Sequence, residues 1–307
     1  MKSRSWMVMS IALTAACSAP DATGVSPATS GGVLTAHTQD LEGTPDLIVD
    51  AQKLATSWVI YDEFVPNVCS AEEGDVVPNM YHRLLRFTVT TPNIGDADVY
   101  IGDPNEHFDP DGNPATEDGD GLFELATCHA HYHFRNYASY ELYPVNPDGS
   151  LGEVIQAAKK GFCMIDVTPY DNARSWYYRN CGRPAIPSLG LTAIAGNQGI
   201  STGWGDTYVK WLAGQYFVID ELPAGRYLLR IVVNPGFTKV AGQPCPVQDV
   251  AGDGKCHNFP ESDYTNNVGE VMITIPEGRP GKTGWGPGGN ELVPKDAWTR
   301  VEDEDKK

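Results

Sequence analysis

The segment Arg226-Tyr227-Leu228-Leu229-Arg230-Ile231-Val232-Val233 has the pattern of a β-strand. It combines β-branched residues with apolar residues at alternate positions, such as Ile231 and Val233. Four more short apolar runs are bounded by turn residues and are also predicted strands: 84–90, 138–143, 216–219 and 270–275. There is no long amphipathic helical pattern and no internal repeat. These patterns predict a mostly-β, sandwich-like single domain with long loops.

The composition agrees with this fold class. The 307 residues are 41% apolar and 10% aromatic, which is enough for a core, and 32 glycines with 23 prolines favour turns. A net charge of −18 disfavours nucleic acid and anionic membrane surfaces as partners. It suits cationic substrates or metal ions, although such a charge can also serve solubility alone.

The N-terminus predicts export. Lys2 and Arg4 precede an apolar stretch that ends before Cys17 and is too short to span a membrane stably. The stretch resembles a bacterial lipoprotein signal, in which residues 1–16 are removed and Cys17 is lipidated. Leu13 lies one position further from Cys17 than usual, so ordinary cleavage and free secretion is the alternative. We expect a cell-envelope lipoprotein or a secreted protein, held to the membrane only through this lipid.

Composition divides the rest of the chain into three parts. Residues 17–43 are rich in small and polar residues and are expected to form a flexible linker. The predicted catalytic domain covers 44–276, and the Gly/Pro-rich, then charged tail 277–307 is expected to be poorly ordered. The loop 103–120 holds seven acids and no Lys or Arg. It is expected to be a solvated insertion, with calcium binding as the alternative.

The run Cys128-His129-Ala130-His131-Tyr132-His133 is the clearest chemical motif. Side chains at alternate positions of a strand point to one face, so a strand would direct all three histidines at one point. Imidazole suits copper, zinc, iron or nickel. The run therefore predicts a metal site, although a polar strand face with unrelated histidines is the simpler reading. By itself it names neither the metal nor the reaction.

The cysteines predict disulfides. Without Cys17, six remain, and in an exported chain they allow up to three bridges with fifteen possible pairings. Those six are Cys69, Cys128, Cys163, Cys181, Cys245 and Cys256.

Several separated segments resemble, in order, the catalytic domain of lysyl oxidases, the copper- and quinone-dependent amine oxidases. The resemblance covers about residues 44–276. The similar segments are Pro45-Asp46-Leu47, Cys69 to Glu73, the histidine run 128–133, Lys159-Lys160-Gly161-Phe162-Cys163, Asp206-Thr207-Tyr208, Pro223 to Pro235 and Glu261 to Asn267.

This resemblance implies a copper site and an organic cofactor. The copper ligands would be His129, His131 and His133. The cofactor would be a lysine tyrosylquinone built from Lys159 and Tyr208, with Lys160 as the runner-up because one gap would shift the register. Without the resemblance, Lys159 would be interpreted as a solvated surface lysine and Tyr208 as a packed aromatic residue.

The resemblance also implies an activity. Such an enzyme converts primary amines, either peptidyl lysine or small amines, to aldehydes, and O₂ reoxidises the cofactor with release of hydrogen peroxide and ammonia. Two alternatives stay open. One is a copper-binding surface protein without quinone or catalysis, and the other is a non-enzymatic module whose only essential metal is calcium.

A calcium site is implied as well. Its oxygen ligands would come from the start of the domain and from a late loop: Asp46, Leu47 through its carbonyl, Glu261, Asp263, Asn266 and Asn267. The alternative is an acidic turn whose Asn side chains cap backbone groups.

The cysteine pairing follows from the resemblance and from its gaps. The family pattern implies Cys128–Cys181. The family partners of Cys69 and Cys163 would fall near Asp75 and Pro169, which are not cysteines. We therefore expect Cys69–Cys163, and a third bridge, Cys245–Cys256, closing an insertion. The chain also lacks the further histidine that the family often has after the copper motif, since residues 134–140 contain none.

Overall fold

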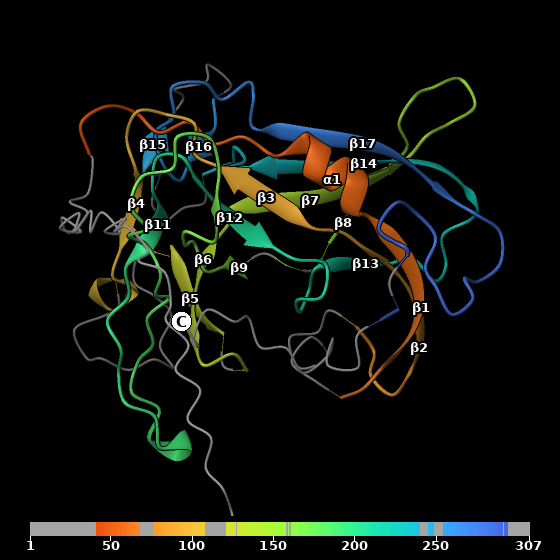
Figure 1. Ribbon diagram of the computed structural model, residues 1–307, viewed down its shortest axis with the longest axis horizontal. Coiled ribbons are helices and arrows are strands. Elements are labelled where there is room, and N and C mark those ends of the chain that lie inside the picture. Colours follow the sequence, from red (N-terminus) through yellow and green to blue (C-terminus); the bar gives the residue numbers. More distant parts are fainter. Residues whose placement is uncertain are drawn as a thin grey trace, which may run out of the picture. The chain divides into compact units, whose positions relative to one another are not determined.

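The computed structural model describes residues 41–67, 71, 76–107, 121–126, 128–157, 159, 161–239, 245–248, 254–290 and 292–293. All of these residues belong to one compact unit, His37–Lys307. Strands dominate this unit, and its described α-helix is the short α1 (Ala51–Ser57) (Figure 1). The mostly-β prediction is therefore confirmed. Within the described ranges, no helix is long and apolar enough to cross a membrane.

The largest sheet contains the strand with which the sequence argument began. Its order is β17 (Val268–Ile275), β14 (Gly225–Val233), β7 (Ala138–Pro144) and β8 (Ile155–Gln156). Leu229 of β14 lies opposite Val271 on one side and Leu142 on the other. Residues 227, 229, 231 and 233 are buried, because alternate residues of β14 face the core. Three of the five predicted strands thus lie in this sheet.

Two three-stranded sheets show where one strand prediction was wrong. The first sheet is β1 (Val59–Val65), β2 (Met80–Arg86) and β13 (Tyr216–Val218), and the second is β10 (Thr168–Pro169), β12 (Trp204–Tyr208) and β3 (Val89–Pro92). The predicted strand 84–90 is therefore two strands. The chain changes partners at Thr88, whose backbone N–H donates to Ser57 Oγ at 3.1 Å instead of to a strand.

A buried ion pair joins the first of these sheets to the chain after β12. Arg86 is fully buried, and its Nε and Nη2 donate to the two carboxylate oxygens of Glu63 at 2.6 and 3.1 Å. Its Nη1 donates to the carbonyl of Lys210 at 2.8 Å. Because a bidentate pair fixes orientation, this contact positions the segment that follows the end of β12.

Smaller sheets complete the unit. The sheet β5 (Phe123–Ala126), β6 (His131–Arg135) and β9 (Gly161–Phe162) carries the histidine run. The strands β4 (Val99–Gly102) and β11 (Gln198–Ile200) form one pair, and β15 (Val247–Gln248) and β16 (Cys256–His257) form another. Two 3₁₀ helices, η1 (Pro104–Glu106) and η2 (Pro187–Leu189), lie in the connections.

One hydrophobic core connects several of these sheets. It includes Phe134 of β6, Phe162 of β9, Tyr208 of β12 and Leu229 of β14. Two of the segments that the resemblance assigned to the active site are therefore fixed by core packing.

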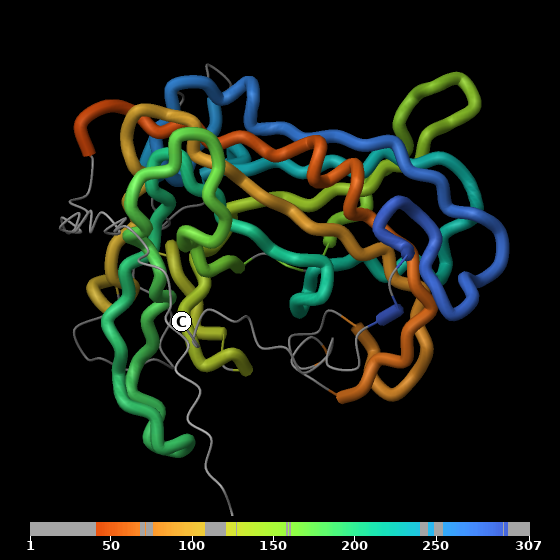
Figure 2. Tube along the Cα trace, in the orientation of Figure 1, coloured from red at the N-terminus to blue at the C-terminus, as the bar shows by residue number. Residues whose placement is uncertain are grey.

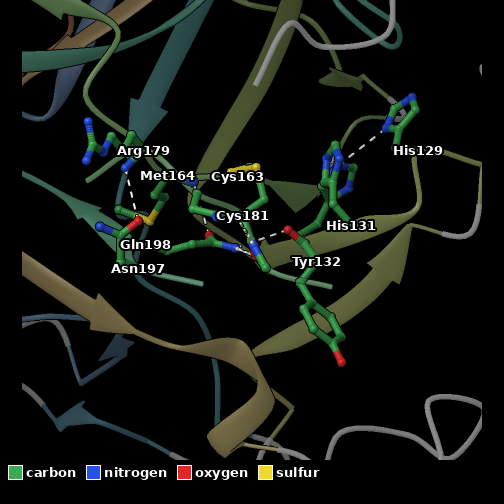
Figure 3. Close-up of a disulfide and its surroundings, with 12 residues drawn as sticks. His129, His131, Tyr132, Cys163, Met164, Arg179, Cys181, Asn197 and Gln198 are labelled. Carbon is green, nitrogen blue, oxygen red and sulfur yellow. Dashed lines mark hydrogen bonds between the residues drawn. A yellow bond between two sulfur atoms is a disulfide. The ribbon is translucent and has the colours of Figure 1, made fainter. Parts of the chain in front are cut away.

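The structure corrects two of the three predicted disulfides. Cys163 is bonded to Cys181, with their Cα atoms 5.3 Å apart, so neither Cys128–Cys181 nor Cys69–Cys163 forms (Figure 3). Cys128 is also disulfide-bonded, and Cys69 lies outside the described residues. Cys245 is bonded to Cys256, as expected for the insertion.

Backbone contacts explain the corrected pairing. The N–H of Tyr132 donates to the carbonyl of Gly182 at 3.1 Å. The buried side-chain amide of Gln198 donates to the carbonyls of Tyr132 and Cys181 at 3.1 and 2.9 Å (Figure 3). Cys181 is thus held beside β6, next to Cys163 at the end of β9. No spacing of cysteines along the chain reveals this contact.

The predictions for the two ends of the chain have different outcomes. The predicted export signal, Cys17 and most of the linker lie outside the described residues, as do 108–120 of the acidic loop. The expectation of a poorly ordered tail is wrong for 277–290, because Trp285 packs on the core and its backbone N–H and carbonyl both bond Ile60, at 2.9 and 2.8 Å. A Cβ on Gly284 would lie 2.8 Å from the carbonyl of Ile60, so glycine permits this approach.

Candidate active site

The three histidines converge, but the sequence explained only two of them. His131 and His133 lie on β6 and share a face, as predicted. His129 lies in a turn before the strand, where the carbonyl of Ala126 accepts from the N–H groups of His129 and Ala130 at 3.1 and 2.7 Å. Ala130 has a left-handed φ of +59°. This turn, rather than strand alternation, places His129 Nδ1 3.5 Å from His133 Nε2 and the His129 ring centre 5.4 Å from that of His131.

The geometry of the three rings fits one metal ion. His133 Nε2 lies 3.1 Å from His131 Nε2 and 3.5 Å from His129 Nδ1. A tetrahedral ion with metal–nitrogen distances of roughly 2.0 Å separates its ligands by about 3.3 Å. All three side chains are buried, with at most 4% of each exposed. Among the described residues, this is the one group of three His, Cys, Asp or Glu side chains close enough to hold an ion.

Strands on both sides of β6 fix the rings. His133 lies opposite Glu124 of β5, and Phe134 lies opposite Phe162 of β9. A Cβ on Gly161 would be 2.5 Å from Glu124 Oε1 and 2.9 Å from His133 Nδ1, so only glycine fits there. The segment that carries the predicted cofactor lysine is therefore packed directly against the histidine strand.

The predicted cofactor pair is brought together. Lys159 is 8% exposed and Tyr208 is 2% exposed, and the Lys159 Nζ lies 4.9 Å from the centre of the Tyr208 ring. The Tyr208 hydroxyl donates to the carbonyl of Cys163 at 2.7 Å. The Phe162 ring packs beside this contact, with its centre 5.1 Å from the Lys159 Nζ and 5.1 Å from the centre of the Tyr208 ring. The interpretation of Lys159 as a solvated surface lysine is wrong. Lys160 lies outside the described residues.

The strand of Tyr208 also carries a buried acid, and near this acid lie a tyrosine and a threonine that the sequence argument missed. Asp206 is fully buried on β12, two residues before Tyr208. Burial, and then the charge of Asp206, raise the pKa of Tyr137 well above its usual value. Tyr137 is hydrogen-bonded to Thr91 Oγ1 and packs edge-on against Phe162, with ring centres 5.5 Å apart. Asp206 and Tyr208 share a face because they are two residues apart on a strand, as their sequence spacing predicts, whereas no sequence pattern indicates Tyr137.

Most of the predicted calcium ligands form a second cluster. Glu261 Oε2 accepts from the N–H of Leu47 at 2.6 Å, and Glu261 Oε1 accepts from Asn267 Nδ2 at 2.7 Å. Asn266 Nδ2 donates to Asp46 at 2.9 Å. Figure 2 shows the first described segment of the chain, in red, beside the blue chain that leads into β17. The structure thus joins residues more than two hundred positions apart.

The cluster also contains Asn234, which the sequence argument missed. Asp263, a predicted ligand, instead bonds within its own turn. Asn234 donates from Nδ2 to Glu261 Oε1 at 2.6 Å, and it directly follows the strand β14. Asp263 is exposed, and its carboxylate accepts from the N–H and hydroxyl of Thr265 within its own turn. Burial raises the pKa of Glu261 to about 7, against the opposing effect of its hydrogen bonds.

Comparison with known proteins identifies the family. The fold and its buried histidine group define a β-rich protein with a candidate metal centre. The model of the lysyl oxidase family matches residues 45–244. The chain therefore belongs to the lysyl oxidase family.

Individual relatives agree with this assignment. The chain is 27% identical over 237 residues to protein-lysine 6-oxidase of Homo sapiens, which covers 74% of this chain and 44% of that protein. It is 28% identical over 247 residues to lysyl oxidase homolog 2A of Danio rerio, covering 78% and 26%. For protein-lysine 6-oxidase of Sus scrofa the identity is 27% over 236 residues, covering 74% of each chain. The chain thus spans less than half the length of the human and Danio rerio relatives.

Proposed function

We propose that this protein is an exported copper-dependent amine oxidase that makes a lysine tyrosylquinone from Lys159 and Tyr208. The observation that carries the proposal is the buried contact between the Lys159 Nζ and the Tyr208 ring, 4.9 Å from its centre. The strand β9, which follows Lys159, pairs with the histidine strand β6. A protein that only binds copper needs the three histidines and not this contact.

The chemistry of the donors supports copper. Three imidazole nitrogens with no thiolate among them suit copper and zinc alike, and the adjacent phenol and amine favour the redox-active ion. When bound, copper supplies the oxidation of a neighbouring phenol by O₂. His129, His131 and His133 would hold it, and their burial keeps bulk water from the site.

The chain's own residues would fix the reacting side chains. The carbonyl of Cys163 holds the Tyr208 hydroxyl, and the edge-on packing of Phe162 holds the ring. Lys159 reaches that ring from a segment that Gly161 anchors against β6. Holding two reacting groups at such short range lowers the entropic barrier to joining them. The substrates would be primary amines, including the lysine side chains of proteins, with O₂ as the second substrate.

The decisive test combines metal content with peroxide release. We expect the purified wild-type protein to bind one copper ion per chain, to stain for a quinone and to release peroxide with cadaverine, benzylamine or lysine peptides. His131→Ala removes a fully buried ligand and should abolish all three properties. A copper-loaded wild-type protein that lacks the quinone and oxidises none of these amines would contradict the proposal and favour the copper-binding alternative.

The late cluster is proposed as a structural calcium site. Two buried amide oxygens, Asn266 Oδ1 and Asn267 Oδ1, have no hydrogen-bond partner within the described part of the chain. An unpaired buried acceptor is costly, and a cation would satisfy both. Carboxylate and amide oxygens are the ligands that Ca²⁺ prefers, and Asp46 with Glu261 would supply the charge. Calcium would then tie the start of the domain to the loop before β17.

This site predicts a calcium-dependent pH profile. The pKa of Glu261 is about 7 in the folded chain, against 4.5 for an ordinary glutamate. Between pH 4.5 and 7 the folded chain therefore keeps a proton on Glu261 that the unfolded chain has lost. In the presence of EGTA, the free energy of unfolding should therefore fall by up to about 3 kcal/mol as the pH rises from 4.5 to 7. Calcium favours the carboxylate and should remove that fall.

Urea unfolding at pH 5 and pH 7.5, with EGTA or with calcium, measures the effect. Glu261→Gln is the matched variant, and it should lose both the pH dependence and the response to calcium. A wild-type protein that is equally stable with and without calcium at pH 7.5 would rule out this site.

Export is also part of the proposal. The predicted signal and the lipid on Cys17 rest on residues 1–17 of the sequence alone. The disulfides Cys163–Cys181 and Cys245–Cys256 support a compartment in which thiols are oxidised.

A further inference from the structure

A cavity of about 450 Å³, here called the lysine cavity, lies where three distant parts of the chain meet. Its walls include Lys53 of α1, Lys210 and Trp211 after β12, and Gly288 and Asn290 after β17. The N–H of Gly288 donates to the carbonyl of Trp58, at the end of α1, at 3.1 Å. Figure 2 shows this blue segment close to the orange end of α1. Neither the three histidines nor Tyr208 are among the described residues of the walls, so the lysine cavity is distinct from the candidate active site.

The charge of the walls is opposite to that of the whole chain. The described residues that line the lysine cavity include two lysines and no acid, whereas the chain has a net charge of −18. Salt screens charges over about 8 Å at physiological ionic strength, so the two lysines act on a ligand in the cavity more strongly than distant acids do. The lysine cavity therefore favours an anion and disfavours a cationic amine.

Lys210 is held in place at the wall. Its N–H donates to Thr88 Oγ1 at 3.1 Å, and its carbonyl accepts from the buried Arg86 at 2.8 Å. Its Nζ donates to the carbonyl of Gly288 at 2.9 Å and lies 5.1 Å from the centre of the Trp211 ring. Because these contacts order the side chain, which is only 9% exposed, little conformational entropy is lost when the ammonium binds a ligand.

Lys53 supplies a second charge, on a side chain that is free to adjust. It is exposed on α1 and forms no ion pair with another described residue. Gly288 keeps the space between the walls open, because a Cβ there would collide with the carbonyl of Ser57 and lie 3.3 Å from Lys210 Nζ. Two ammonium groups at one cavity match a ligand that carries two negative charges, since charge-assisted hydrogen bonds are the strong ones.

We propose that the lysine cavity binds a small organic dianion whose charges are carried by phosphate or carboxylate groups. Its volume lies in the range of about 300–1,000 Å³ that is typical of small-molecule sites, which favours an organic ligand over a lone inorganic ion. Lys53 and Lys210 bind the two charges, and Val209 and Trp211 contact the organic part. The bound ligand joins α1 to the segments after β12 and β17 and so stabilises the fold. This inference does not depend on the proposed function.

The test measures binding of simple dianions to the whole protein. Succinate and inorganic phosphate are the probes at pH 7.5, and acetate and cadaverine are compared with them at the same ionic strength. Calorimetry should show one dianion bound per chain, and Tm should rise by at least about 3 °C at a hundred-fold excess over Kd. Acetate and cadaverine should leave Tm unchanged. The tighter of the two probes identifies the charged group of the ligand.

Charge reversal at two exposed lysines makes the test specific. Lys53→Glu should weaken binding of the dianion at least ten-fold, and Lys210→Met should do the same. Lys282→Glu is the matched control, since Lys282 is an exposed lysine after β17 that does not line the cavity, and its Kd should change less than two-fold.

Three results would overturn the proposal. They are an unchanged Kd in Lys53→Glu, an equal loss of affinity in Lys282→Glu, and a rise in Tm with acetate as large as with succinate and phosphate. Because Lys53 is exposed, Lys53→Glu is expected to fold even if Lys210→Met does not. Binding is measured without an amine, so the result stands whether or not the protein oxidises amines.

Discussion

Tyr208→Phe should abolish amine oxidation while leaving copper binding intact. The change removes one oxygen atom, and without it the ring cannot become a quinone. We expect a loss of at least about a thousand-fold in kcat for every amine, because the covalent step itself is lost. Copper should stay at one ion per chain, because the three histidines are its proposed ligands and the lost hydroxyl bonds the carbonyl of Cys163. Peroxide release, quinone staining and metal analysis measure the three expectations.

Tyr140→Phe is the matched control for this experiment. Tyr140 is also a buried tyrosine that packs edge-on against Phe162, with ring centres 5.6 Å apart, and its hydroxyl bonds Gln215. Its loss should cost about 1 kcal/mol of stability and leave the quinone in place. Full amine oxidation in Tyr208→Phe would refute the assignment of the tyrosine. Loss of copper in the same variant would indicate that the substitution disturbs the histidine group instead.

Lys159→Met should give the second large effect. Methionine keeps the apolar stem of the side chain and removes the amine that would join the Tyr208 ring. We expect no lysine–tyrosine cross-link by mass spectrometry, no quinone stain, and a loss of amine oxidation as large as in Tyr208→Phe. The copper content should not change. Because both residues form one covalent cofactor, the double variant of Lys159→Met and Tyr208→Phe should oxidise amines no more slowly than either single variant.

Lys160→Met tests the alternative lysine in the same way. It should retain the cross-link and oxidise cadaverine at a rate within about two-fold of the wild type. If Lys160→Met is inactive and Lys159→Met is active, the register of the resemblance is shifted by one residue and the cofactor lysine is Lys160. If both variants keep the quinone, neither lysine forms it.

The sequence predicted the strands better than the contacts between distant segments. Alternating burial in β14 follows directly from its period of two. The order of the motifs pointed to Lys159 and Tyr208, and the structure brings these two side chains into contact. The prediction of one strand over 84–90 was wrong because an apolar run does not show where a chain leaves one sheet and enters another. That change occurs at Thr88, whose N–H bonds the Ser57 hydroxyl. The position of His129 depends on a left-handed Ala130, a conformation that the alanine itself does not suggest.

The disulfide error has a similar cause. The pairing was predicted from the positions of the cysteines along the chain. In the structure, hydrogen bonds to the carbonyls of Cys181 and Gly182 hold Cys181 beside β6, next to Cys163. The residues predicted to bind calcium illustrate both outcomes, since Glu261 and Asn267 lie in contact as the resemblance implied. Asn234 was missed because its role depends on where β14 ends in space, beside a loop that lies 27 residues later in the chain.

The carbonyl that holds Tyr208 belongs to a cysteine of the bridge Cys163–Cys181. One residue is thus held at two points, through its sulfur by Cys181 and through its carbonyl by the Tyr208 hydroxyl. Under the proposed function, closing the bridge would fix this acceptor for the phenol before the cross-link to Lys159 forms. Thiol oxidation and cofactor synthesis would then be coupled steps of one maturation.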